Sequence, residues 1–252
     1  MSEAATKGSN GELLEARDIS VHFEGLAALD GLSVSLDRTE IFGLIGPNGS
    51  GKTTLVNVLT GFQKATAGRV TLSGRDITDW PPYRIGRAGL SRTFQAVRLF
   101  RDLSVLENLE IAGVGHGLSR RAAEKRAVDI LEWMNFEHKA YDLADTLPYG
   151  DERRVGIGRA LASAPQFVLL DEPAAGLTDA ECDDIMQLIA RIPADFGCGV
   201  LLIEHNMRVI MGVCGRIHVI ESGQSVAEGP PGDIQSNPDV IRAYLGSKPQ
   251  DA

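Results

Sequence analysis

One segment constrains the fold of this chain more than any other. Residues Gly46-Pro-Asn-Gly-Ser-Gly51-Lys52-Thr53 match the pattern Gly-x-x-x-x-Gly-Lys-[Ser/Thr]. The unbroken apolar run Ile41–Ile45 precedes the match, and Thr53–Phe62 follows with helical character. A buried strand, a glycine-rich loop and a helix in this order form the repeating unit of a parallel sheet covered by helices. The segment therefore predicts an α/β fold with a phosphate-binding loop after a buried strand.

The residue types in this loop suit the phosphate groups of a nucleoside triphosphate. Its glycines let successive backbone N–H groups turn inward, and the helix from Lys52 directs the positive end of its dipole at the same point. We expect Lys52 to reach the β- and γ-phosphates and the Thr53 hydroxyl to ligate Mg²⁺. The predicted nucleotide-binding residues are Gly46, Pro47, Asn48, Gly49, Ser50, Gly51, Lys52, Thr53 and Thr54.

Two acidic residues that follow a second apolar run could complete such a site. Phe167–Leu170 reads as a buried strand, and the carboxylates Asp171 and Glu172 follow it directly. Ligands of open α/β sheets bind at the carboxyl ends of the strands. Asp171 suits the outer coordination sphere of Mg²⁺, whereas Glu172 points the other way along the strand and suits the role of general base toward water.

The rest of the chain divides by its hydrophobic periodicity. Apolar and polar residues alternate over Leu13–Val21 and Leu32–Leu36, which predicts antiparallel strands with one wet face. Apolar residues recur at three- and four-residue intervals between Val105 and Leu147, which predicts a helical subdomain. Val200–Ile203 is another buried strand. Beyond it we expect a strand over Gln224–Glu228, a turn over Gly229–Gly232 and a terminal helix over Asp239–Leu245.

Composition excludes several classes of protein. The 252 residues are 43% hydrophobic and 23% charged, as in an ordinary globular protein. A net charge of −9 argues against general nucleic-acid binding, which needs clustered cations, and we read the basic group Arg120, Arg121, Lys125 and Arg126 as a solvated helix face. No apolar stretch is long enough to cross a bilayer, and Met1–Asn10 is polar, so we expect no membrane span and no secretory signal. The three cysteines, Cys182, Cys198 and Cys214, read as buried apolar residues.

These motifs, in this order, resemble the nucleotide-binding subunit of an ABC transporter from about Leu13 to Leu245. The resemblance implies ATP and Mg²⁺ as ligands. It places Phe23 against the adenine ring, Gln95 in contact with Mg²⁺ and the attacking water, and His205 in contact with the γ-phosphate. Glu172, His205 and Gln95 are then the expected catalytic residues, and Thr53, Gln95 and Asp171 the expected metal site.

The signature segment departs from the family pattern. The family usually has Leu-Ser-Gly-Gly-Gln where this chain has Leu147, Pro148, Tyr149, Gly150 and Asp151. By resemblance this segment caps the ATP held by a second subunit, through backbone N–H groups and the dipole of a helix expected over Glu152–Ala164. Asp151 adds negative charge there, so we expect weaker binding of the partner's ATP. Thr178 stands where the family commonly has Asp.

Several further segments resemble the ATPases of branched-chain amino-acid importers. They are Arg92-Thr-Phe-Gln95, Arg98-Leu-Phe100, Leu147-Pro-Tyr-Gly150, Asp171-Glu-Pro-Ala-Ala-Gly-Leu177, Ile203-Glu-His-Asn-Met207 and Val240-Ile-Arg-Ala-Tyr-Leu-Gly246. Importers of urea, amides or other amino acids, and a lipid-exporting ATPase, share most of these features and remain alternatives. A different class, a non-transport switch driven by ATP-dependent dimerisation, usually has two nucleotide domains or a long coiled-coil insertion, and this chain has neither.

The resemblance also implies a working assembly. We expect a single ATPase domain over residues 11–252, with a nucleotide-binding core and β subdomain over 1–94 and 151–252 and a helical subdomain over 95–150. The expected partners are integral membrane permease subunits, a second ATPase subunit that is either a copy or a paralogue, and indirectly a periplasmic or surface solute-binding protein. The protein would then lie in the cytoplasm on the inner face of the membrane. Gln95–Phe100 carries apolar Val97, Leu99 and Phe100 and is the expected contact with the permease, unless Leu99 and Phe100 pack inside the helical subdomain.

Overall fold

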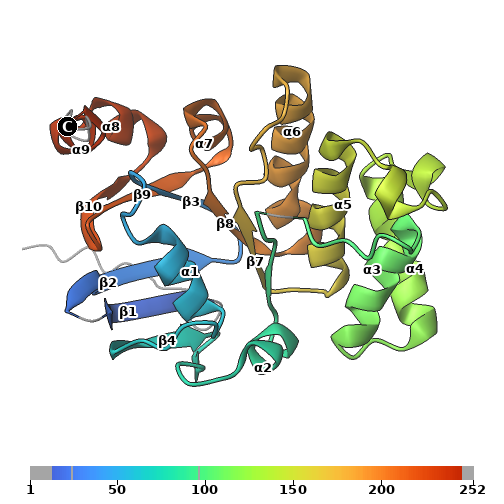
Figure 1. Cartoon of the computed structure of the whole chain (residues 1–252), viewed down its shortest axis with the longest axis horizontal. Coiled ribbons are helices and arrows are strands. Elements are labelled where there is room, and N and C mark those ends of the chain that lie inside the picture. Colours follow the sequence, from blue (N-terminus) through green and yellow to red (C-terminus); the bar gives the residue numbers. More distant parts are fainter. Residues whose placement is uncertain (1–12, 24, 96, 246–252) are drawn as a thin grey trace, which may run out of the picture.

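The chain folds into two sheets and a group of helices, as the computed structural model in Figure 1 shows for residues 13–23, 25–95 and 97–245. The strands are β1 (Leu13–Phe23), β2 (Leu26–Asp37), β3 (Ile41–Ile45), β4 (Ala67–Leu72), β5 (Arg75–Asp76), β6 (Leu90–Arg92), β7 (Phe167–Asp171), β8 (Gly199–Ile203), β9 (Arg216–Glu221) and β10 (Gln224–Gly229). The α-helices are α1 (Lys52–Leu59), α2 (Pro82–Arg87), α3 (Val105–Gly115), α4 (Arg120–Trp133), α5 (Tyr149–Ala162), α6 (Asp179–Phe196), α7 (Met207–Val213), α8 (Pro231–Ser236) and α9 (Pro238–Leu245). Two short 3₁₀ helices are η1 (Glu137–Lys139) and η2 (Ala144–Thr146).

The first sheet is antiparallel, in the order β2-β1-β4-β5. Leu14, Ala16, Ile19 and Val21 of β1 are buried, while residues between them remain accessible. The predicted alternation over Leu13–Val21 and Leu32–Leu36 is therefore confirmed, and β2 extends beyond the second of these ranges in both directions. One face of this sheet packs against α1 and against strands β3, β7 and β8 of the second sheet, and their buried side chains form one apolar cluster.

The second sheet positions the chemistry of the chain. Its order is β10-β9-β3-β8-β7-β6, and every pair except β10 with β9 is parallel. The predicted strands β3, β7 and β8 are confirmed, and all residues in them are buried. Because β8 lies between β3 and β7, the loops after these three strands meet at one edge of the sheet. Those loops carry the glycine-rich segment, Glu172 and His205, and Asp171 ends β7 at the same edge.

Helices α3, α4 and α5 pack together at one end of the long axis of the molecule, while α8 and α9 lie at the other (Figure 1). The helical prediction for Val105–Leu147 is confirmed. Ser104 begins α3 with a reciprocal capping box to Glu107, which satisfies two backbone donors at once. The predicted helix over Glu152–Ala164 is wrong at both ends. It begins at Tyr149 because Pro148 serves as its N-cap, and it ends at Ala162 shortly before Ala164, whose φ of 56° is left-handed.

Two smaller predictions, the turn near the C-terminus and the basic helix face, are only partly confirmed. The turn predicted over Gly229–Gly232 is partly wrong, because Pro231 occupies the first helical position of α8, where its missing N–H costs nothing. Arg120, Arg121 and Lys125 are exposed as predicted. Arg126 is not part of a solvated face, since its guanidinium donates to the Leu161 carbonyl at 2.8 Å.

All three cysteines are buried and free, as predicted. Burial raises the pKa of the Cys198 thiol and of the Cys214 thiol to about 12, and it also raises the pKa of Cys182. Among the described helices, none has the length and apolar composition needed to cross a membrane.

Candidate functional site

The glycine-rich loop lies between β3 and α1 and depends on glycine at two points. Gly46 has φ 155°, and a Cβ there would lie 2.0 Å from the Ile220 carbonyl oxygen. Gly51 has φ 106°, and a Cβ there would lie 2.7 Å from the Ala28 carbonyl oxygen. Any larger residue would push the loop away from the neighbouring strands. The loop geometry therefore accounts for these two positions of the sequence pattern.

Lys52 begins α1 and folds its side chain back across the loop. Its ammonium donates to the carbonyl oxygens of Gly46 at 2.7 Å and Pro47 at 2.9 Å, and the residue is only 7% exposed. Burial lowers the pKa of Lys52, and the charges of Glu172 and Asp171 oppose that effect. A cation is thus held at the mouth of the loop, where it can exchange neutral carbonyl partners for an anionic ligand.

A cavity of about 420 Å³ opens in front of this loop. Its wall brings together predicted residues from four separate segments of the chain, namely Asn48, Gly49, Ser50, Gly51, Lys52, Thr53, Thr54, Gln95, Asp171, Glu172 and His205. Gly46 and Pro47 shape the loop but are not among the lining residues. Phe23 is 46% exposed and stands beside the cavity rather than in its wall, which Leu26, Ala27 and Ala28 of β2 form instead.

The two carboxylates at the end of β7, Asp171 within the strand and Glu172 directly after it, have different surroundings. Asp171 is buried, and its backbone N–H donates to the Thr93 hydroxyl at 3.1 Å. Glu172 turns out of the strand with φ 49°, a conformation that non-glycine residues rarely adopt, and its N–H donates to the Ile203 carbonyl at 2.9 Å. Its carboxylate meets His205 Nε2 at 2.9 Å. A carboxylate and an imidazole thus face each other across the ends of two neighbouring strands.

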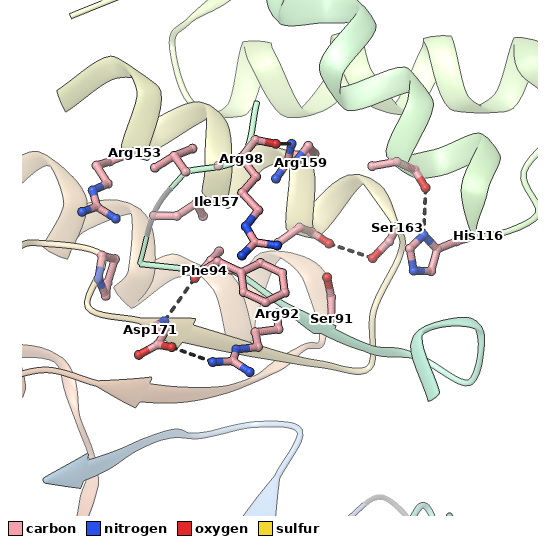
Figure 2. Close-up of a pocket in the computed structure, with 16 residues that line it drawn as sticks. Ser91, Arg92, Phe94, Arg98, His116, Arg153, Ile157, Arg159, Ser163 and Asp171 are labelled. Atoms are coloured by element: carbon pink, nitrogen blue, oxygen red, sulfur yellow. Dashed lines mark hydrogen bonds and ion pairs between the residues drawn. The ribbon is translucent and has the colours of Figure 1, made fainter. Parts of the chain in front are cut away.

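Sequence reasoning missed a buried cation beside Asp171. Arg92, at the end of β6, donates to Asp171 Oδ2 at 2.8 Å and to Asn57 Oδ1 at 2.6 Å. The side chains of Arg92 and Asp171 are 9% and 8% exposed. Figure 2 shows Arg92 extending under the Phe94 ring toward Asp171. The available signal was an arginine at the end of a short strand that begins with buried Leu90, because a charge drawn into the interior requires a partner.

The same arginine lines a cationic pocket between the sheet and α5 (Figure 2). This pocket of about 160 Å³ is lined by Arg92, Arg98, Arg153 and Arg159, with Asp171 as the one carboxylate among its lining residues. An adjoining groove of about 460 Å³ runs between α2 and α3 and shares Phe94 and His116 with the pocket. Exposed apolar side chains line the groove, including Phe62, Tyr83 and Ile111.

The segment Gln95–Phe100 has a mixed outcome. Ala96 lies outside the described residues. Val97 packs near Gly156 of α5, and Leu99 is partly buried against the main apolar cluster, whereas Phe100 is 51% exposed. The packed interpretation therefore holds for Leu99, and the exposed interpretation holds for Phe100.

The signature segment opens α5, away from the wall of the nucleotide cavity. Leu147 is buried, and Pro148 caps the helix. The Tyr149 hydroxyl donates to the Ala175 carbonyl at 3.2 Å, and Gly150 leaves room for the Glu181 side chain. Lys139 Nζ forms an ion pair with the Asp151 carboxylate and offsets part of its negative charge, while the expected weaker binding of the partner's ATP stays a prediction.

Thr178 has a local structural reason. It is the N-cap of α6, where its hydroxyl accepts the N–H of Glu181 at 3.4 Å while the Glu181 carboxylate accepts the N–H of Thr178 at 2.9 Å. This reciprocal capping box favours threonine at the position. The same bonds lower the pKa of Glu181.

The sequence of this chain matches known protein families and relatives. Residues 29–175 match the model of the ABC transporter family, and residues 225–248 match the model described as branched-chain amino acid ATP-binding cassette transporter. The high-affinity branched-chain amino acid transport ATP-binding protein LivG of Salmonella typhimurium strain LT2 is 43% identical over 249 residues, covering 93% of this chain and 98% of that protein.

Solved structures agree with the sequence matches. The ADP conformation of MJ1267, an ATP-binding cassette of an ABC transporter, superposes with a TM-score of 0.85 at 33% identity, covering 94% of this chain and 99% of that one. A dimeric post-hydrolysis structure of the cassette MJ0796 bound to ADP and Pi has a TM-score of 0.75 at 25% identity. The match covers 86% of this chain and 98% of that one. The loop, the paired carboxylates and these matches together show that the chain belongs to the ABC transporter family, as one of its ATP-binding and ATP-hydrolysing subunits.

Proposed function

We propose that this chain energises an importer of branched-chain amino acids from the cytoplasmic face of the membrane. The observation that carries this proposal is the match of residues 225–248 to the branched-chain amino acid cassette model, because that segment lies outside residues 29–175, which match the general ABC transporter model. The likeness to LivG over nearly the whole chain supports the same choice over urea, amide or lipid transport.

The nucleotide roles follow from the cavity in front of the glycine-rich loop. Lys52 exchanges its carbonyl partners for the β- and γ-phosphates, and the loop N–H groups complete the cradle. Thr53, Gln95 and Asp171 line one cavity, and their oxygens are ligands that Mg²⁺ accepts, directly or through water. Bound Mg²⁺ neutralises charge that develops on the phosphates. Phe23 stacks on the adenine ring from the rim of the cavity.

Hydrolysis is assigned to the pair after β7 and β8. Glu172 is the general base that orients and deprotonates the attacking water, and His205 supports it from 2.9 Å away while contacting the γ-phosphate. Gln95 joins them at the cavity wall. The left-handed conformation of Glu172 directs its carboxylate toward His205 rather than along the strand.

A second ATPase subunit, either a copy or a paralogue, completes the assembly. The N-terminus of α5 faces the partner's ATP, and Lys139 offsets part of the negative charge that Asp151 places there. The residues that present this helix end are Leu147, Pro148, Tyr149, Gly150 and Asp151. The dimeric structure of the related cassette MJ0796 supports this arrangement.

The permease is proposed to dock on the groove between α2 and α3. That groove is apolar, and the adjoining pocket carries four arginines in a chain whose net charge is −9. We therefore expect a permease segment with apolar side chains for the groove and an acidic side chain for Arg98, whose guanidinium stacks on Phe94 at 4.9 Å. Residues 95–150 form the subdomain that transmits nucleotide state to this surface, and a solute-binding protein contributes only indirectly.

Two experiments test this function. In the first, the molecular mass of purified Glu172→Gln in solution is measured with ATP-Mg²⁺ and without nucleotide. We expect ATP-Mg²⁺ to double the mass, because blocked hydrolysis retains the ATP at a dimer interface. A mass that ATP-Mg²⁺ leaves unchanged argues against self-pairing.

In the second experiment, the gene is deleted in its host and uptake of labelled leucine, isoleucine, valine and urea is compared. Loss of uptake of the three amino acids alone is expected, with restoration by the wild-type gene and none by Lys52→Met. Normal uptake of the amino acids, or loss of urea uptake alone, contradicts the proposed substrate.

A further inference from the structure

Glu204 is an unusual residue for its position. It follows the buried strand β8 directly, precedes His205, and is only 3% exposed. A carboxylate taken from water into such a site is stable only when hydrogen bonds replace its hydration. Burial accordingly raises the pKa of Glu204, and backbone hydrogen bonds oppose the rise.

Three backbone N–H groups replace the lost hydration. Ala174 N–H donates to Glu204 Oε1 at 2.7 Å. His205 N–H donates to Oε2 at 3.2 Å, and Asn206 N–H donates to the same oxygen at 3.4 Å. Within the described part of the chain, no cationic side chain forms an ion pair with this carboxylate. Its partners are thus the loop after β7 on one side and the loop after β8 on the other.

These two loops carry the residues proposed for hydrolysis. Ala174 lies two positions after Glu172, so the hydrogen bond to Oε1 anchors the backbone that holds Glu172 in its left-handed conformation. The bond to Oε2 anchors the backbone of His205 itself. A single buried carboxylate therefore connects both members of the pair whose side chains meet at 2.9 Å. Strained backbone of this kind persists only where the surroundings hold it.

We propose that Glu204 is a positioning residue that holds Glu172 and His205 at the separation needed for attack of water on the γ-phosphate. This inference rests on the roles proposed above for Glu172 and His205. Glu204 does not touch the nucleotide cavity, whose lining residues include both members of the pair but not Glu204. Its effect should therefore fall on turnover and not on ATP binding.

The test is the Glu204→Gln variant of the full chain, measured for kcat, for KM toward ATP and for melting temperature. The amide keeps the shape of the side chain, but its NH₂ group cannot accept a backbone N–H, so one of the two loops loses its anchor. We expect kcat to fall about 10- to 100-fold, the range seen when supporting residues of an active site are removed, while KM is unchanged. Glu204→Asp retains the charge and should recover part of the lost kcat.

Glu40→Gln is the matched control. Glu40 also accepts a backbone N–H, from Asp37 at 2.8 Å, and pairs with Arg216, but it precedes β3 at the opposite end of the sheet. The Glu40→Gln variant should have a lower melting temperature than the wild type and an unchanged kcat. Wild-type kcat in Glu204→Gln overturns the proposal.

A purely structural role has a different signature. In that case kcat per folded molecule would be normal in both Glu204 variants, and a loss of folded protein would account for any lower activity; this result also overturns the proposal. If Glu204→Gln does not fold, Glu204→Asp carries the test, because its shorter side chain cannot span both loops and a normal kcat would contradict the positioning role. Wild-type hydrolysis by Glu172→Gln would instead refute the proposed function, whatever Glu204 does.

Discussion

Replacement of Arg92 by methionine tests how the acidic end of β7 is held. Arg92 and Asp171 form an ion pair at 2.8 Å with side chains 9% and 8% exposed, and Arg92 also donates to Asn57 at 2.6 Å. Methionine fills a similar space without a charge or a donor. The variant therefore leaves the Asp171 carboxylate buried without its cation.

The expected cost follows from that burial. Removing one partner of a buried ion pair lowers the free energy of unfolding by about 3–5 kcal/mol, because the remaining charge is neither paired nor hydrated. For a chain of this size each kcal/mol corresponds to about 2–4 °C in melting temperature, so we expect a decrease of about 6–20 °C. Arg101→Met is the control, since Arg101 is 61% exposed and lies 3.4 Å from Glu152. Its cost should stay below about 1 kcal/mol.

Differential scanning calorimetry of the two variants and of Arg92→Met combined with Asp171→Asn provides the measurement. The double variant should recover much of the stability lost in Arg92→Met, because no buried charge is then left alone. Equal melting temperatures for Arg92→Met and Arg101→Met would refute the reasoning. So would a double variant whose loss is the simple sum of the two single losses.

Two further predictions concern the loop and the thiols. Lys52→Met should weaken ATP binding by about 10- to 150-fold, as measured by calorimetric titration, because charge-assisted hydrogen bonds to the phosphates are lost. Lys125→Met, on an exposed helix face, is the control. Equal affinities of the two variants for ATP would contradict the role of Lys52 in phosphate binding. Because burial raises the pKa of Cys198 and Cys214 to about 12 and also raises that of Cys182, none should react with a disulfide reagent at pH 8 in the folded protein, while all three react after denaturation. Fast reaction of any of them in the folded state would contradict the burial.

Local patterns in the sequence were enough to predict the framework of the site. The apolar run Ile41–Ile45, the glycines that follow and the helix from Lys52 are neighbours in the chain, so their arrangement depends on backbone geometry over a few residues. The same holds for Phe167–Leu170 with its two carboxylates. Helix ends were less well predicted, since Pro148 began α5 three residues before the expected start and Pro231 began α8 inside an expected turn.

Only the tertiary structure decided which side chains meet. Arg92 and Asp171 are 79 positions apart, and Glu204 and Ala174 are 30 apart. Their contacts exist because β6, β7 and β8 lie side by side in the sheet, an order that no local pattern encodes. The charge of Asp151 is another case, because its partner Lys139 lies at the end of η1 and η2 separates the two residues along the chain. A sequence specifies the backbone locally, whereas the partner of a buried charge depends on strand order and packing across the whole fold.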